Sequence, residues 1–579
     1  MLDLKITGGT LVDGTGTTPR PGSVGVRDGR IVAVGDVDED ATRTIDATDL
    51  VVAPGFVDPH THYDAQLYWD PMATPSSWHG VTSVVGGNCG FTLAPLNERD
   101  ADFTRRMMAQ VEGMPLVALQ DGVKWGWESF GEYLSGLDGH ISVNAGFLVG
   151  HCALRRYVMG SEASEREATD DEVSSMVRVL HESLSAGGMG LSTSRSSTHQ
   201  DGDGVPVPSR FASEAELLTL CRVVGEHPGT QLEAIVQGCL GRFSPEEVEL
   251  LAQMSSLARR PLNWNVLSVD SGSRDRTEHQ LLPSKRAKEI GGRVLALTMP
   301  VFSDNNMSFL TFCALWLLPG WRDVLDVEVP ERIRRLKDPA VRADMMEKAK
   351  GSNLAGVAQF ERYLIGQTYS DANKQFEGRL VGDIAKERGV DPFTAIIDIV
   401  ATDDLRTVLW PQPATNTPAD WLARAELWQR DDVLLGGSDA GAHLDRILGS
   451  PYPTKFIGDT LRGRRLVPLE RAVQLLTDVP ARWFGMKDRG RLAEGYHADV
   501  VVFDPATVNA EPPQTVFDLP GESKRLLAGS IGVEHVFVNG VETVTAGRAT
   551  GATAGVVLRS TTLDTVDTSN ERDGARPSG

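Results

Sequence analysis

The sequence is poor in cysteine and in basic residues. Its 579 residues include only five cysteines, and none forms a Cys-x-x-Cys pair. This excludes a disulfide framework and fits a reducing cytoplasm. Lys and Arg number 57 against 79 Asp and Glu, giving a net charge of −22. Because so acidic a chain repels nucleic acid and anionic lipid, we expect neither nucleic acid nor a membrane as a partner.

The sequence also lacks a long hydrophobic run. Its most apolar stretch, residues 309–318, is about half as long as the ~20 residues that span a bilayer. Residues 1–9 have none of the features of a signal peptide. With 41% hydrophobic and 23% charged residues, the composition is that of a globular protein. We therefore expect a cytoplasmic protein with a large core.

Both ends of the chain have the pattern of short β-strands. In residues 1–54 apolar and polar residues alternate between Gly turns, and Asp28-Gly29 is typical of a hairpin. The same pattern returns near the other end, with a hairpin signal at Asn539-Gly540. We predict that residues 1–54 and 488–560 form one small β-sandwich domain. Residues 561–579 have few large apolar side chains and are predicted to be a disordered tail.

The middle of the chain alternates strand-like and helix-like segments, as in βα units around a parallel sheet. The clearest helix follows Thr169, and Glu172 completes its capping box. Eight strands are indicated, one ending at Pro59-His60 and the others at 83–85, 143–149, 190–192, 231–236, 261–267, 294–298 and 433–435. The fold class is therefore α/β. We predict a (β/α)8 TIM-like barrel over residues 55–487, with an insertion at about 300–430 because a minimal barrel needs only ~250 residues.

The sharpest local signal is the pair His60 and His62. Residues 51–57 have the pattern of a buried strand, and side chains two apart on a strand point the same way. Two imidazoles at the C-terminal end of a barrel strand suit a divalent metal such as zinc. Taken alone, the pair is more often solvated or caps a helix.

Further motifs change this balance. They are Pro54-Gly55-Phe56-Val57-Asp58-Pro59-His60-Thr61-His62, Gly87-Asn88-Cys89-Gly90, residues 149–155, residues 190–194, Gly437-Ser438-Asp439 and residues 476–504. On these motifs nearly the whole chain resembles the amidohydrolase superfamily, and within it the N-acyl-D-amino-acid deacylase (D-aminoacylase) branch. The resemblance implies a (β/α)8 barrel with a terminal β-sandwich. It also implies metal-dependent hydrolysis of a non-peptide C–N bond, such as the amide of an N-acyl amino acid.

The resemblance implies roles for four residues. His60 and His62 would hold a metal, and Cys89 would be a thiolate ligand. Asp439 would bind metal or activate water, taking its proton and later passing it to the leaving amine. Each has a simpler alternative, since a free Cys is commonly a small buried apolar residue and Asp often caps a helix.

The chain departs from the family pattern at the fifth and sixth strands, which usually supply one histidine each. Residues 231–237 and 262–268 contain no histidine, and the nearest polar residues are Glu233 and Asn265. Glu233 can supply an anionic oxygen ligand, whereas Asn265 suits a hydrogen bond to a substrate carbonyl or water. We therefore predict one zinc ion on the four residues above, with Glu233 as a further candidate ligand. A second ion would need Glu233 or another group, and we make no prediction of one.

Loop residues near the predicted barrel mouth are candidates for binding a small-molecule substrate. His151, Arg195 and His199 could contact it, or could simply order their loops. Cations that could anchor a substrate carboxylate are Arg195, Arg274, Arg276 and Lys455. The apolar segment 309–321 is compatible with an acyl pocket, with core packing or with association into a homo-oligomer.

Two other functions fit the same residues. One is hydrolysis of a cyclic amide, an ester or a lactone on the same scaffold, because chemistry follows loops and ligands rather than fold. The other is a metal-poor barrel that acts in binding or assembly. Assays with N-acyl-D-amino acids and elemental analysis distinguish these from the first prediction.

Overall fold

The computed structural model describes residues 1–311, 313–352, 354–566 and 568. The chain divides into two compact units, of which unit 1 takes in residues 1–303 and those from 418 on, and unit 2 residues 304–417. Unit 2 falls inside the span of the predicted insertion. Most of the predicted tail, residues 567 and 569–579, lies outside the described residues.

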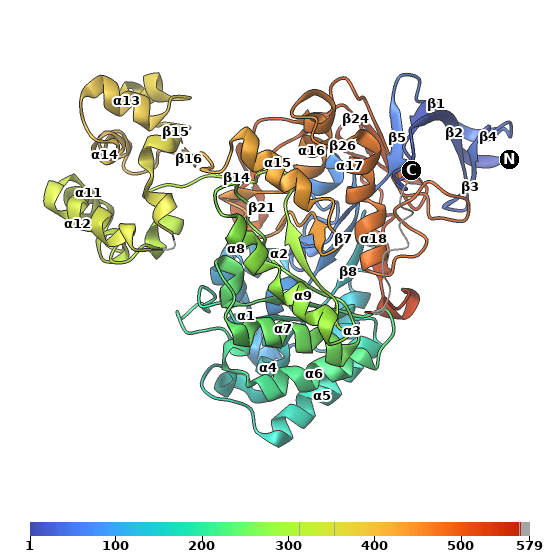
Figure 1. Cartoon of the computed structure of the whole chain (residues 1–579), viewed down its shortest axis with the longest axis horizontal. Coiled ribbons are helices and arrows are strands. Elements are labelled where there is room, and N and C mark those ends of the chain that lie inside the picture. The colour runs from blue at the N-terminus through green and yellow to red at the C-terminus, as the bar shows by residue number, and fades with distance from the viewer. Residues whose placement is uncertain (312, 353, 567, 569–579) are drawn as a thin grey trace. The chain divides into compact units, whose positions relative to one another are not determined.

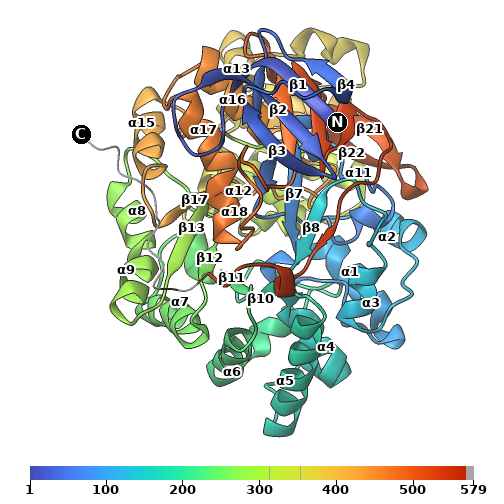
Figure 2. The ribbon, with the colours of Figure 1, turned by 90° about the vertical axis from the view of Figure 1, so that its right-hand side faces the viewer.

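Both ends of the chain contribute to one nine-stranded sheet of unit 1 (Figure 2). Strand β5 pairs with β19 antiparallel, with Val52 opposite Val502, and this pairing joins the two ends. Both predicted hairpins are present, because Asp28, Gly29, Asn539 and Gly540 all have the positive φ that a type I′ turn requires. The strands are β1 (Leu2–Leu11), β2 (Arg20–Arg27), β3 (Arg30–Gly35), β4 (Ala41–Asp46), β5 (Val51–Pro54), β19 (Val500–Phe503), β24 (Val533–Val538), β25 (Val541–Thr545) and β26 (Arg548–Ala549).

The middle of the chain forms parallel strands in chain order, and each predicted strand is present. They make two hydrogen-bonded sheets rather than one closed ring. The first contains β6 (Phe56–Asp58), β7 (Val81–Gly86) and β8 (Asn144–Phe147), with β27 (Val557–Leu558) beside β8. The second contains β9 (Val149–Gly150), β10 (Gly190–Ser194), β11 (Gln231–Ile235), β12 (Leu262–Trp264), β13 (Val294–Thr298) and β17 (Val433–Leu435).

Two short connections relate these sheets. Only Leu148 separates β8 from β9 along the chain. A parallel bridge between Thr61 and Ala440 joins the segment after β6 to the segment after β17. The residues that follow these two strands, one near each end of the sequence, are therefore neighbours in space.

Helices connect the parallel strands and lie outside them (Figures 1 and 2). Thr169 caps α5 and forms the predicted capping box with Glu172, while Met176, Leu180 and Leu184 are fully buried. No helix among the described residues is long and apolar enough to cross a membrane. The helices of unit 1 are α1 (Ala101–Val111), α2 (Leu116–Gly122), α3 (Phe130–Ser135), α4 (His151–Met159), α5 (Asp170–Ser185), α6 (Glu214–Gly225), α7 (Pro245–Ala258), α8 (Arg274–Gln280), α9 (Leu282–Glu289), α15 (Pro418–Leu427), α16 (Tyr452–Arg462), α17 (Leu469–Leu476) and α18 (Asp478–Trp483).

Unit 2 has a hydrophobic core of its own. Phe393 stacks on Phe360 at 4.7 Å and on Trp321 at 5.6 Å between ring centroids, and Phe309 is fully buried beside them. The apolar segment 309–321 therefore places Phe309 and Trp321 in this core. The elements of unit 2 include α10 (Arg322–Leu325), α11 (Val329–Lys337), α12 (Pro339–Lys350), α13 (Val381–Arg388), α14 (Pro392–Thr402), β15 (Tyr363–Ile365) and β16 (Leu409–Pro411).

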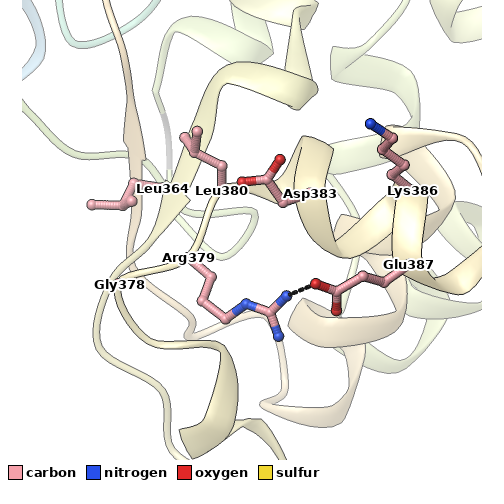
Figure 3. A pocket seen from close by; sticks show the side chains of 7 residues that line it. All are labelled: Leu364, Gly378, Arg379, Leu380, Asp383, Lys386 and Glu387. Atoms are coloured by element: carbon pink, nitrogen blue, oxygen red, sulfur yellow. Dashed lines mark hydrogen bonds and ion pairs between the residues drawn. The ribbon is translucent and has the colours of Figure 1, made fainter.

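Unit 2 also carries an open pocket of about 570 Å³ (Figure 3). Arg379 and Glu387 pair across it at 2.5 Å, and Asp383 and Lys386 add two further charges of opposite sign. Because these charges balance, the pocket has no clear preference for an anion or a cation.

Candidate metal centre

His60 and His62 follow β6 directly and are buried. Their exposed fractions are 3% and 1%, and their ring centroids lie 5.2 Å apart. Thr61, between them, donates its backbone N–H and its hydroxyl to the Val85 carbonyl, each at 2.9 Å. These bonds hold the segment against β7, so that both imidazoles reach the same centre.

Cys89 enters the centre from the turn that follows β7. Its backbone is left-handed, with φ at 56°, and Asn88 fixes the turn by donating to the Thr61 and Val85 carbonyls. The Cys89 Sγ lies 3.7 Å from His60 Nε2, and burial raises the pKa of the thiol well above its ordinary value. A thiolate here therefore needs a cation beside it.

Asp439 comes from the loop after β17. Its backbone N–H donates to the His60 carbonyl at 3.1 Å, and its φ of 60° lies in the left-handed region. One carboxylate oxygen is 3.1 Å from His62 Nε2 and 3.7 Å from His60 Nε2. The side chain is 38% exposed, so this carboxylate meets both the buried histidines and open space.

Glu112 completes the centre, and the sequence reasoning missed it. It follows the last residue of α1, its side chain is only 5% exposed, and its Oε2 lies 3.5 Å from His62 Nε2. Its carbonyl accepts the backbone N–H of His443. No motif in the sequence marks it; in the structure the next residue, Gly113, has φ at 57°, and a Cβ there would meet His443.

Glu233 and Asn265 lie beside Cys89. Glu233, on β11, accepts the Cys89 backbone N–H at 2.7 Å, and burial raises its pKa to about 8. Asn265, directly after β12, donates its side-chain amide to Cys89 Sγ at 3.4 Å. Glu233 Oε1 and Asn265 Oδ1 are buried without a hydrogen-bond partner among the described residues.

The two histidines differ in protonation because their neighbours differ. Burial and the charge of His62 lower the pKa of His60 to about 3, so the ring is neutral at neutral pH and one of its nitrogens has a free lone pair. Burial also lowers the pKa of His62, but Glu112 and Asp439 outweigh it and raise the value to about 10. Burial raises the pKa of Asp439, yet the hydrogen bond and charge of His62 hold it below its ordinary value.

The donor atoms fit a divalent metal. They form two sets, His60–His62–Cys89 and His62–Glu112–Asp439, in each of which all atoms lie within 4.8 Å of one another. Bonds of 2.0–2.3 Å in a tetrahedral zinc site place ligand atoms about 3.3–3.6 Å apart. The 3.1, 3.5 and 3.7 Å separations measured here are close to those edges. Cys89 and Asp439 fall into different sets, so the predicted four-residue ligand set is divided.

The profile of the amidohydrolase family matches residues 43–545. The chain belongs to the amidohydrolase family. D-aminoacylase of Alcaligenes xylosoxydans xylosoxydans is 30% identical in an alignment of 577 residues that covers 96% of this chain and 98% of that protein. The resemblance inferred from the motifs is thereby confirmed. This amidohydrolase is a metal-dependent hydrolase of non-peptide C–N bonds.

Solved structures agree with this assignment. A crystal structure of D-aminoacylase matches 96% of the amidohydrolase and 100% of its own chain, with a TM-score of 0.64 and 27% identity. The N-acyl-D-glutamate deacylase of Bordetella bronchiseptica, complexed with zinc and a phosphonate inhibitor, matches 96% and 99% with a TM-score of 0.62 and 27% identity. That relative holds zinc, and the donor set here fits a divalent metal.

The predicted substrate-binding residues of the amidohydrolase differ in position. Both ring nitrogens of His151 are used inside the protein, by Thr193 and Glu216, each at 2.9 Å, which favours the structural alternative. Arg195 donates to the Ala212 carbonyl at 3.1 Å. His199 lies nearer the centre: burial, then the charge of His62, lowers its pKa to about 4, and Ser194 binds its Nδ1 at 2.7 Å.

Two of the candidate anchors for a substrate carboxylate already have acidic partners. Arg276 pairs with Asp270 at 2.8 Å, and Arg274 with Glu426 at 3.5 Å. To bind a substrate carboxylate, either arginine would have to give up its present pairing with an acidic side chain of the protein.

Proposed function

We propose that this amidohydrolase removes the acyl group from N-acyl-D-amino acids, using one zinc ion held by the cluster around His62. The observation that carries the proposal is the convergence of His60, His62, Cys89 and Asp439 from the ends of three separate strands. The named activities of the relatives, D-aminoacylase and N-acyl-D-glutamate deacylase, supply the substrate class.

We also propose that the parallel strands close into a (β/α)8 barrel, with β8 and β9 counted as one strand. In such barrels the active site lies at the C-terminal ends of the strands. His60, Cys89 and Asp439 each follow a strand end, and the bridge between Thr61 and Ala440 links the first strand position to the last.

Asp439 is the proposed general base and acid. Its carboxylate is ionised at neutral pH because of His62, and it faces open space where a substrate amide can approach. It takes a proton from the attacking water and later delivers it to the leaving amine. When bound, the divalent ion supplies Lewis-acid chemistry, which polarises the scissile carbonyl and lowers the pKa of water to about 7.

The test is a panel of N-acetyl-D-amino acids, their L-enantiomers, and cyclic amides, esters and lactones. We expect release of free amine from D-substrates by the zinc-loaded enzyme, and loss of release in the double variant His60→Ala, His62→Ala. Hydrolysis of the cyclic or ester substrates alone would replace the proposal with the first alternative. Substoichiometric metal after purification and reloading would favour a binding protein instead.

A further inference from the structure

The centre contains a buried carboxylate that the proposed function does not use. The Glu112 side chain is 5% exposed, and the side-chain ion pair that the described residues give it is with His62 at 3.5 Å. One carboxylate oxygen of Asp439 lies 3.1 Å from Nε2 of the same imidazole. Burying a carboxylate costs several kcal/mol unless it is paired or binds a metal. Two carboxylates therefore face one imidazole, and together they carry a net negative charge that a divalent ion would neutralise.

The two donor sets share His62 and therefore compete for it. Its Nε2 faces Glu112 and Asp439, and an imidazole nitrogen has a single lone pair that binds one ion. An ion on His60, His62 and Cys89 and another on His62, Glu112 and Asp439 cannot both use it. Which of the two donor sets binds an ion through His62 depends on the residues around each set.

Around Cys89, the sulfur and the backbone N–H have hydrogen-bond partners, whereas Glu233 Oε1 and Asn265 Oδ1 have none among the described residues. Cys89 Sγ accepts the Asn265 amide and lies against His60, while its backbone N–H is bound by Glu233. Glu233 and Asn265 belong to the fifth- and sixth-strand segments, where the usual histidine ligands are missing. The other side offers two carboxylates, of which that of Asp439 reaches open space.

We infer that Glu112 is a metal ligand that holds the ion of this amidohydrolase together with His62 and Asp439. The inference rests on the proposed metal-dependent function. The ion then lies beside the proposed base Asp439, and the residue that follows α1, between the second and third strand positions, supplies an oxygen ligand in place of the missing histidines.

The experiment titrates metal-stripped full-length protein with Co²⁺ and follows both affinity and the visible and near-ultraviolet spectrum. The variants are Glu112→Gln and, as a control that also removes a buried carboxyl group beside the same centre, Glu233→Gln. We expect Glu112→Gln to weaken Co²⁺ binding by about tenfold or more, and Glu233→Gln by less than about threefold. We also expect no thiolate-to-cobalt charge-transfer band, and an unchanged spectrum in Cys89→Ser.

Thermal unfolding of the metal-free proteins separates ligation from folding. Because Glu112→Gln removes a buried charge, the thermal unfolding midpoint of the metal-free variant should not fall below that of the metal-free wild type. The increase in this midpoint on adding Co²⁺ should be smaller in the variant than in the wild type. Equal losses in Glu112→Gln and Glu233→Gln, or a charge-transfer band that Cys89→Ser abolishes, would overturn the inference alone. Failure of the wild type to bind Co²⁺ or Zn²⁺ would overturn the metal-dependent function, and this inference with it.

Discussion

At the scale of single residues, the centre is built from backbone positions that side chains rarely adopt. Cys89, Asp439 and His443 all have φ between 48° and 60°. Such positions cost about 1–3 kcal/mol each and persist where the surrounding structure fixes them. Here hydrogen bonds from Asn88, from Asp439 to His60 and from His443 to Glu112 fix all three. The ligands are thus held in place before an ion binds.

Asp439→Asn tests the proposed base. The amide cannot accept the proton of the attacking water, so kcat for amine release should fall by about 100-fold or more. The measurement is steady-state hydrolysis of an N-acetyl-D-amino acid, with bound zinc determined on the same samples. Retention of more than half of the wild-type kcat would remove Asp439 from the mechanism.

The pH dependence of stability tests a buried histidine remote from the proposed ligands. His79 donates Nε2–H to the Ala528 carbonyl at 3.1 Å and binds Thr454 through Nδ1 at 2.7 Å. Burial lowers its pKa from 6.5 to about 4. The unfolded chain therefore binds one more proton between these values, and stability falls as pH drops from 6.5 to about 4.

In His79→Gln this part of the acid loss should disappear. The free energies of unfolding of the two proteins should converge by up to about 3 kcal/mol between pH 7 and pH 4. Denaturant unfolding at several pH values measures this difference. Parallel pH profiles for the two proteins would show that His79 does not titrate in this range.

The sequence could identify part of the site, for a physical reason. His60 and His62 are two apart directly after a strand pattern, and Asp439 and Cys89 stand in short motifs that also follow strand patterns, so the sequence places each near a strand end. Glu112 has no such motif. Its position depends on how the long connection between β7 and β8 packs over the centre, which is a property of tertiary structure.

At the scale of elements, helix α5 shows how a local sequence pattern determines the residue at which a helix begins. Thr169 Oγ1 accepts a hydrogen bond from the Glu172 backbone N–H, and the Glu172 carboxylate accepts one from the Thr169 backbone N–H at 2.8 Å. Thr169→Ala should lower the free energy of unfolding by about 1 kcal/mol. Ser174→Ala, at an exposed position of the same helix, is the control and should change it little. Equal effects of both substitutions in denaturant unfolding would contradict the capping role.

Strand positions were predictable, and strand lengths less so. The Pro261–Leu267 pattern predicts a long strand, but β12 ends at Trp264, and Val266 is 42% exposed. The two N-terminal runs at residues 4–6 and 10–12 fall largely in one strand, β1. A register shift between Ile6 and Gly9 absorbs the glycines that suggested a turn.

At the scale of the whole molecule, a buried carboxylate ties the terminal sheet to the parallel strands. Asp499 pairs with Arg489, accepts the backbone N–H of Asn539 at 2.8 Å and accepts the Asn144 amide at 3.1 Å. Asn144 begins β8, whereas Asn539 lies in the hairpin of the terminal sheet. The two ends of the chain are thereby joined to its middle.

Asp499→Ala should destabilise unit 1 by about 3–5 kcal/mol, because it leaves the Arg489 guanidinium buried without its partner. The control is Arg242→Ala, which removes an exposed ion pair with Asp275 and should change stability little. Equilibrium denaturation of both variants measures the difference. A loss below about 1 kcal/mol in Asp499→Ala would mean that the terminal sheet and the parallel strands are joined mainly by other contacts.

The central claim is that His62 and its neighbours hold a catalytic divalent ion. Anomalous X-ray diffraction at the zinc absorption edge, on crystals of the zinc-loaded amidohydrolase, tests it most directly. The account predicts one strong anomalous peak bonded to His62 Nε2, with oxygen atoms of Glu112 and Asp439 around it. A peak elsewhere in the chain, or none near His62 after zinc loading, would contradict it.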